Sequence, residues 1–105
     1  MVDSSIPKFF EKSLKERLGV VADFSGLSQE ELKIIEDATG GISYNEADRM
    51  IENAIGTFSL PLGIATNFRI NDKDYLIPMV IEEPSVIAAA SKAAKIARIH
   101  GGFKA

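Results

Sequence analysis

Two adjacent carboxylates, Glu82 and Glu83, are the side chains in this sequence whose position best suits acid–base chemistry. They stand directly before Pro84 and Ser85, between an apolar stretch and an alanine-rich one. A carboxylic acid donates a proton near neutral pH only when burial or a neighbouring like charge disfavours its charged form. The partial positive charge at a helix N-terminus has the opposite effect, because it favours the charged carboxylate by about 0.3–1 kcal/mol. On chemistry alone, an acidic pair at such a place is more often a helix-start feature than a catalytic acid.

The other polar candidates each have an ordinary structural interpretation. Ser85 reads as a first-turn serine, and Glu52 and Asn53 read as solvated residues on the outer face of an earlier helix. The single histidine, His100, is expected near a helix C-terminus, with a structural role. A small basic cluster could meet a ligand phosphate or could simply be a solvated helix face: Lys8, Lys12, Lys15 and Arg17.

Composition excludes several classes of protein. The 105 residues fit one domain or part of one, and 46% of them are hydrophobic, as in globular proteins. The net charge of −3 gives no electrostatic drive toward nucleic acid or acidic membranes, so neither is expected as a partner. Without cysteine the chain has no disulfide or thiolate zinc site, and we expect no metal. No apolar run approaches the ~18 residues of a membrane span and the N-terminus lacks a signal-peptide pattern, which predicts a cytoplasmic protein.

The elements that must position these residues follow from capping signals and periodicity. Three serines, Ser13, Ser28 and Ser43, each precede a glutamate by three residues, the spacing of a capping box. Beyond residue 56 the pattern changes to alternation, then to a polar turn and a second apolar run containing Pro78, which favours an edge strand or a bulge. We expect a hairpin whose second strand is covered on both faces. The predicted helices span residues 14–23, 29–38, 44–55 and 85–100, and the predicted strands span 62–70 and 75–81.

The last predicted helix is apolar on nearly all sides. Its polar side chains form a narrow stripe, while Pro84 suits its first turn and Gly101-Gly102 its end. Such a helix belongs inside a larger body, and one hairpin cannot cover it. The fold class is therefore α+β, with N-terminal helices, an antiparallel hairpin and a buried alanine-rich helix. We expect either the N-terminal part of a larger protein or self-association.

Two segments, residues 50–63 and residues 81–91, together resemble class II 3-hydroxy-3-methylglutaryl-CoA reductase. The first reads Met-Ile-Glu-Asn-Ala-Ile-Gly-Thr-Phe-Ser-Leu-Pro-Leu-Gly, and the second reads Ile-Glu-Glu-Pro-Ser-Val-Ile-Ala-Ala-Ala-Ser. The resemblance extends over nearly the whole chain. It differs from the family at Ala54, where the family usually has valine.

The resemblance implies an α/β enzyme that reduces 3-hydroxy-3-methylglutaryl-CoA to mevalonate and CoA with two NADH or NADPH, or runs in reverse. It implies that Glu83 is a catalytic proton donor and that Ser85 contacts the acyl group of the substrate. The family's catalytic lysine, aspartate and histidine and its nicotinamide-binding domain would lie beyond residue 105. The resemblance also implies a homo-oligomer built from dimers, with these subunit-contact residues: Glu52, Asn53, Ile55 and Gly56.

The expected organisation is a helical arm over residues 1–43 and, over residues 44–105, the start of a substrate-binding large domain. We hypothesise that Glu83 keeps its proton near neutral pH in the complete enzyme, or shares it with a cation. A chain of these 105 residues alone is expected to be inactive. The alternative from another class is a stand-alone α+β interaction module that dimerises through the Gly56 region and the alanine-rich helix.

Overall fold

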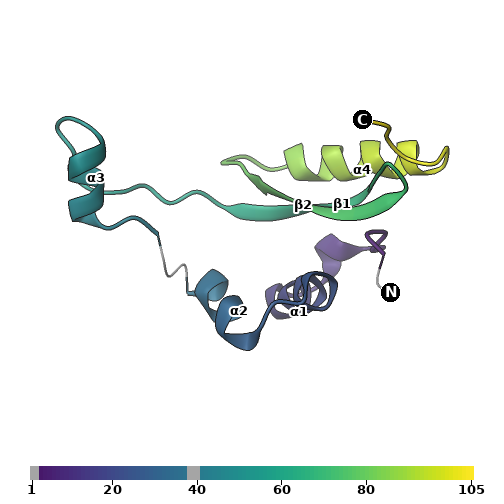
Figure 1. Ribbon diagram of the computed structural model, residues 1–105, viewed down its shortest axis with the longest axis horizontal. Helices are drawn as coiled ribbons and strands as arrows, with labels where there is room; N and C mark the ends of the chain where they lie inside the picture. Colours follow the sequence, from purple (N-terminus) through teal and green to yellow (C-terminus); the bar gives the residue numbers. More distant parts are fainter. Residues whose placement is uncertain (1–2, 38–40) are drawn as a thin grey trace.

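The computed structural model describes residues 3–37 and 41–105, and within them the chain is an α+β arrangement of helices around one hairpin (Figure 1). A short 3-10 helix, η1 (Phe9–Glu11), leads into α1 (Leu14–Ser25) and α2 (Gln29–Glu36). Next come α3 (Tyr44–Met50), β1 (Leu62–Ile70), β2 (Lys73–Val80) and α4 (Val86–Arg98). The molecule is elongated, 50 × 29 × 25 Å, with α3 standing apart from the other elements.

The three predicted capping boxes are confirmed. The hydroxyls of Ser13, Ser28 and Ser43 each accept a hydrogen bond from the amide three residues on, and each serine amide donates to the carboxylate of the paired glutamate. Donation from the Ser13 and Ser28 amides to the carboxylates lowers the pKa of Glu16 and Glu31. These local bonds need no tertiary partner, which explains why the helix starts could be predicted.

The predicted helix ends were less accurate. α1 continues two residues beyond the predicted end and stops at Gly26, whose φ of 74° lies in the left-handed region. α2 ends at Glu36, and part of its predicted end, residue 38, lies outside the described residues. The prediction of a helix to residue 55 was wrong, because α3 ends at Met50 and Asn53 takes a left-handed φ of 58°. Apolar periodicity alone does not hold a helix that has no surface to pack on.

The hairpin is confirmed, with two corrections. Its turn is the residue pair Asn71-Asp72, both left-handed, which is the geometry that joins antiparallel strands with the correct twist. The strict alternation predicted for β1 was wrong, because a bulge lies between Ala65 and Phe68 and Asn67 takes a φ of 70°. Pro78 lies in an edge strand, as expected, since the sheet has two strands. The second correction is that this chain covers neither face of β2 completely. Asp74 and Leu76 on one face and Ile77 and Met79 on the other are half-buried, and the remaining residues of the strand are exposed.

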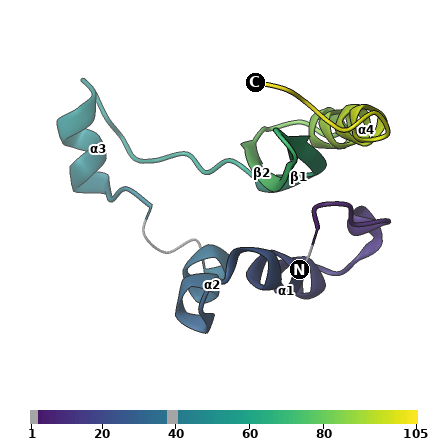
Figure 2. The same cartoon turned by 45° about the vertical axis from the view of Figure 1, so that its right-hand side comes forward.

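Helix α4 packs along β1, and together with β2 these elements make the most extensive contacts among the described residues (Figure 2). Its predicted glycine end is confirmed, because Gly101 and Gly102 both have left-handed φ and turn the chain back toward β1. There the Phe103 amide donates to the Arg69 carbonyl at 2.7 Å, and the ring of Phe103 stacks on that of Phe68 at 5.5 Å. The expectation for Pro84 was wrong, since it precedes the N-cap Ser85 and does not lie in the first turn.

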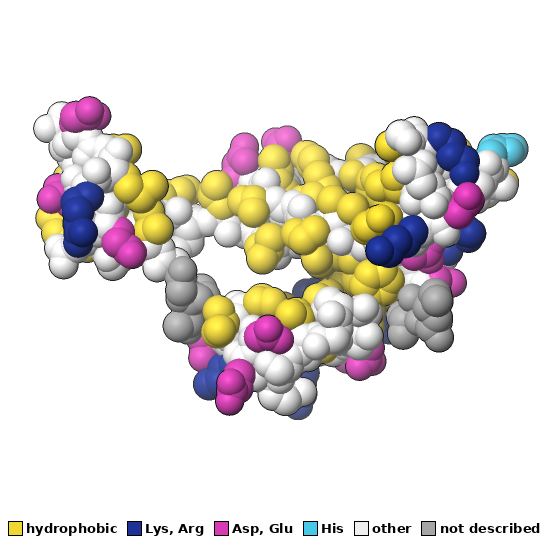
Figure 3. Space-filling view, viewed as in Figure 1, with side chains coloured by type: hydrophobic (Ala, Val, Ile, Leu, Met, Phe, Trp, Pro, Cys, Tyr) yellow, Lys and Arg dark blue, Asp and Glu magenta, His cyan; other side chains and the backbone are white. Residues whose placement is uncertain are grey.

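The core formed by the described residues is small. Its fully buried apolar side chains are all alanines: Ala47, Ala65 and Ala94. Within this chain α4 is not surrounded as predicted, because Ile96 and Ile99 are exposed. Apolar side chains gather on the facing sides of the hairpin and the N-terminal helices (Figure 3). That region holds the groove described below.

Candidate active site

The acidic pair lies in the bend between β2 and α4. Glu82, Glu83 and Pro84 line one side of a cavity of about 300 Å³, opposite the start of β1. All three residues are exposed, so the described residues do not supply the apolar surroundings expected for Glu83. What this chain supplies is the position of the carboxylate and not its burial.

Ser85 differs from every other helix-starting serine in the described residues. Its φ of 80° is left-handed, and its hydroxyl does not cap the helix, whereas Ser13, Ser28 and Ser43 are extended and do cap theirs. A left-handed non-glycine residue is strained, and such residues concentrate at functional sites. The interpretation of Ser85 as an ordinary first-turn serine was therefore wrong. The conformation places the serine in the bend that carries Glu83.

The side chain of Ile87, in the first turn of α4, reaches Gly63 of β1. A Cβ atom at Gly63 would come within 2.5 Å of Cδ1, the far end of the Ile87 side chain, so a larger residue would force that side chain to move. Gly63 and Ile87 line both the small cavity and the larger groove. The role of Gly63 was missed from the sequence, where it stands only as part of a family motif. Its signal was a glycine inside an otherwise apolar strand, which often marks close backbone approach.

Polar bonds fix α4 along β1. The Thr66 amide donates to Ser91 Oγ at 3.0 Å, and the Asn67 side-chain amide donates to the Ser91 carbonyl at 3.1 Å. Ser91 Oγ in turn donates to the Ile87 carbonyl at 2.9 Å. The bulge at Asn67 is what brings these groups together. It therefore sets where Ser85 and Glu83 lie relative to the strand.

A groove of about 590 Å³ continues from the small cavity between α4, β1 and the N-terminal segment with α1. Its walls are largely apolar, and every charged residue that lines it is basic: Lys8, Arg17, Lys92 and Lys95. Two of these belong to the cluster noted in the sequence, while Lys12 and Lys15 do not line the groove. At about 1.5 Å per helical residue, Lys95 lies about 15 Å along α4 from Ser85. The groove therefore suits an extended ligand with a reactive group at one end and anionic groups at the other.

The predicted subunit-contact residues are not part of this groove. Glu52, Asn53, Ile55 and Gly56 lie in the segment of residues 51–61 that joins α3 to β1, and all four are exposed. The predicted placement of Glu52 and Asn53 on a helix was wrong, since α3 has already ended. Ile55 is 96% exposed and Phe58 is 88% exposed. The segment thus presents apolar side chains to whatever lies outside this chain.

The described residues contain neither a candidate metal site nor a candidate membrane-spanning helix. Among the described residues, no group of three or more metal-ligating side chains occurs. No helix within the same residues is long and apolar enough to cross a membrane.

Comparison with known proteins gives consistent matches. The family model for hydroxymethylglutaryl-coenzyme A reductase matches residues 13–105. The 3-hydroxy-3-methylglutaryl-coenzyme A reductase of Archaeoglobus fulgidus is 62% identical over 97% of this chain, which spans 23% of that protein. A probable reductase of the same name from Borreliella burgdorferi is 40% identical over 84% of the chain, which spans 19% of that protein.

Solved structures agree. The 3-hydroxy-3-methylglutaryl-coenzyme A reductase from Streptococcus pneumoniae superposes with a TM-score of 0.83 and 41% identity, over 95% of this chain and 24% of that one. Another structure is described as the class II enzyme from the same organism bound to NADPH in open conformations, with a TM-score of 0.82. The chain thus spans about a quarter of the length of the proteins it matches.

Proposed function

Because this chain belongs to the hydroxymethylglutaryl-coenzyme A reductase family, we propose that the complete protein interconverts 3-hydroxy-3-methylglutaryl-CoA with mevalonate and free CoA. The observation that carries the proposal is that Glu83 lines a small cavity which shares Gly63 and Ile87 with a groove whose charged lining is entirely basic. Ser85 follows Glu83 in the same bend, as the N-cap of α4. A CoA thioester has matching chemistry, with an acyl group at one end and phosphates at the other.

In this proposal the groove orders the substrate along α4. The acyl group lies at the bend, near Ser85 and Glu83, and the long arm of CoA runs over the apolar floor formed by β1 and α4. The phosphates lie toward Lys92 and Lys95, which α4 presents one turn apart. Arg17, whose guanidinium donates to the Lys12 carbonyl, is held as a further cation in the opposite wall.

Glu83 would act on the carbonyl oxygen of the acyl group. Reduction of a thioester, and then of the resulting aldehyde, builds negative charge on that oxygen, and a positioned acid lowers the barrier by supplying a proton. The open position of Glu83 means that any burial it gains comes from other parts of the complete protein or from the substrate itself. Ser85 would orient the acyl group, because its hydroxyl is not engaged in capping.

Two NADH or NADPH molecules supply the hydrides of this reaction. The groove and the small cavity are assigned to the thioester, so we place the nicotinamide site outside this chain and derive no step through it. The NADPH complex of the pneumococcal relative supports the use of such a coenzyme by the complete protein.

We also propose that residues 1–43 form a helical arm and that residues 44–105 begin the substrate-binding domain of a homo-oligomer. The exposed apolar side chains of residues 51–61 support a subunit contact there. The cytoplasmic location stays a prediction from the sequence.

The test is Glu83→Gln in the complete protein. This change keeps the shape of the side chain and removes its proton, so turnover of the CoA thioester is expected to fall by about 10²–10⁴-fold. Binding of the thioester, measured by titration calorimetry, should change little. The matched control is Glu30→Gln, which alters an exposed carboxylate in α2 that lines neither cavity and should leave turnover within a few-fold of wild type. Wild-type turnover in Glu83→Gln would contradict the proposal.

A further inference from the structure

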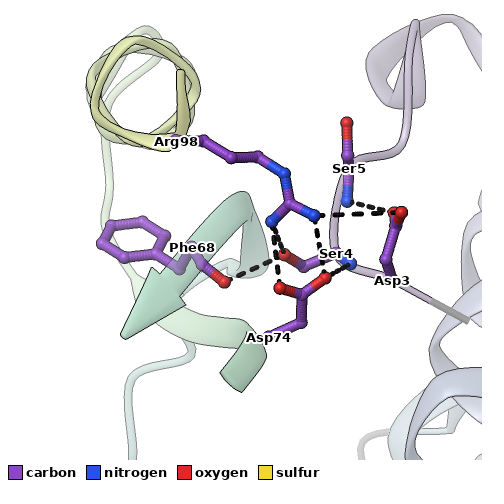
Figure 4. A network of polar contacts seen from close by, with 6 residues as sticks. All are labelled: Asp3, Ser4, Ser5, Phe68, Asp74 and Arg98. Atoms are coloured by element: carbon purple, nitrogen blue, oxygen red, sulfur yellow. Dashed lines mark hydrogen bonds and ion pairs between the residues drawn. The ribbon is translucent and has the colours of Figure 1, made fainter. Parts of the chain in front are cut away.

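The N-terminal segment is attached to the rest of the molecule by a cluster of polar side chains at the far end of α4 (Figure 4). Arg98 binds Asp74 through both nitrogens of its fork, Nη1 to Oδ1 at 3.0 Å and Nη2 to Oδ2 at 3.0 Å. The side chains are 18% and 16% exposed. A two-point pair in this degree of burial is screened far less than a surface pair and has a defined geometry.

The residue that this pair holds is Ser4, which is fully buried. The Ser4 amide donates to Asp74 Oδ2 at 2.9 Å, and its hydroxyl donates to the Phe68 carbonyl at 2.9 Å. The Asn67 amide donates to the Ser4 carbonyl at 2.7 Å. Every polar group of Ser4 is thus bonded to the hairpin. Arg98 reaches the Ser4 hydroxyl as well, at 3.3 Å.

The chain passes from this anchor directly into the wall of the groove. Ser5, Ile6 and Pro7 line the groove, as do residues of η1 and α1 beyond them. Within the described residues, the extensive contacts between elements are those of β1 with β2 and of α4 with β1, and α1 makes none of comparable extent. The position of the groove's outer wall therefore depends on the bonds at Ser4.

Resting on the function proposed above, we infer that Arg98 and Asp74 are positioning residues for the CoA thioester, acting through Ser4 to hold residues 5–10 and α1 as one wall of its groove. They touch neither the reacting atoms nor the groove, since neither of them lines it. They hold the outer wall of the groove in place against the bound arm of CoA. The chemistry at Glu83, at the opposite end of α4, is left unchanged.

The same hairpin provides a matched control. Lys104 pairs with Asp72 by one contact of 3.2 Å, and the two side chains are 68% and 70% exposed. Surface pairs of this kind contribute ~0–1 kcal/mol, whereas breaking a partly buried pair leaves an unpaired charge and unsatisfied partners. Comparing the loss of each pair therefore distinguishes the effect of the Ser4 anchor from the effect of removing a positive charge near the hairpin turn.

The experiment uses the complete protein with Arg98→Ala, Arg98→Lys and Lys104→Ala. Arg98→Ala is expected to raise the KM for the CoA thioester about tenfold or more, with kcat within about twofold of wild type, the pattern of lost binding that is equal in ground and transition states. Hydrogen exchange at the Ser4 and Asn67 amides should accelerate in parallel. Arg98→Lys, which keeps the charge and loses the fork, should give an intermediate KM. Lys104→Ala should leave both measurements unchanged.

The outcomes separate this inference from the function on which it rests. Faster exchange at Ser4 and Asn67 with an unchanged KM would overturn it, because the anchor would then be structural alone. A fall in kcat at constant KM would overturn it as well. Asp74→Asn, which keeps the side-chain volume, breaks the same pair and gives the same test if Arg98→Ala does not fold. A wild-type protein that neither binds nor reduces the thioester would remove the proposed function, and this inference with it.

Discussion

Two regions of this chain carry the family's motifs, and they are organised in different ways. The unit of β1, β2 and α4 holds Glu83 and Ser85 through the chain's own contacts: a bulge, two amide donations to Ser91 and the packing of the Ile87 side chain on Gly63. The segment of residues 44–61 holds Glu52 and Gly56 on an extended stretch that follows a short helix and exposes apolar side chains.

The comparison shows that the chain's own contacts fix the position of one motif, whereas the other motif lies on a segment with few contacts inside this chain. In the first region the close approaches are made by glycine and alanine, so small changes of volume should be costly. In the second region the large side chains are exposed in this chain, so the same kind of change should have little effect on its folding. The following predictions test how each of the two regions is held in place.

The largest effect is expected for Gly102→Ala. Its φ of 86° is strained for alanine, and a Cβ atom there would overlap the carbonyl oxygen and backbone of Arg69. Together these should destabilise the β1–β2–α4 unit by about 3 kcal/mol or more. Hydrogen exchange of the β1 and β2 amides in the complete protein measures the loss.

Gly19→Ala is the opposite control. Gly19 lies within α1, where an added Cβ atom would meet open space and the φ is not left-handed, so alanine should stabilise that helix by up to about 1 kcal/mol. Equal exchange rates in Gly102→Ala and wild type would show that the close packing at Arg69 does not stabilise the unit.

An intermediate effect is expected for Ile55→Asp in the second region. If residues 51–61 form a subunit contact, burial of Ile55 contributes about 1.5–3 kcal/mol to association. The dissociation constant of the oligomer should then rise about 10–100-fold, measured by analytical ultracentrifugation, with β1 and β2 exchange unchanged. The matched control is Ile99→Asp at the end of α4, an isoleucine that is 75% exposed, and it tests whether any added charge disrupts assembly. An oligomer insensitive to Ile55→Asp would place the contact elsewhere.

The smallest effect is expected from pH, and it should be confined to the first region. Hydrogen bonding from Arg98, with help from the Ser4 amide and the nearby charge of Arg69, lowers the pKa of Asp74. A lowered carboxyl pKa gives stability that is present above the unfolded value of about 3.9 and is lost as the pH falls through the folded value. Arg98, whose pKa the Asp74 carboxylate raises, stays charged throughout this range.

Protection of the Ser4 and Asn67 amides, corrected for intrinsic exchange, should therefore decline below about pH 4 in wild type. In Asp74→Asn it should be lower at neutral pH and should change less with acid. A wild-type profile as flat as that of Asp74→Asn would show that the ionised pair does not stabilise the anchor.

Much of this molecule was determined by the sequence alone, because the signals were local. Capping boxes at Ser13, Ser28 and Ser43, the turn at Asn71-Asp72 and the glycine end of α4 each depend on atoms a few residues apart. The family, too, could be identified from two segments of linear sequence, and Glu83 and Ser85 were named from them.

What the tertiary structure alone decided depends on atoms far apart in the chain. The bulge at Asn67, the close approach of Gly63 to Ile87 and the anchoring of Ser4 by Arg98 across 94 positions leave no periodic or capping signal in the sequence. The early end of α3, at Met50, shows the converse, because there a periodic signal in the sequence was not followed by a helix. Periodicity records which face a helix would bury, but the free energy of burial exists only where another surface is present to receive that face.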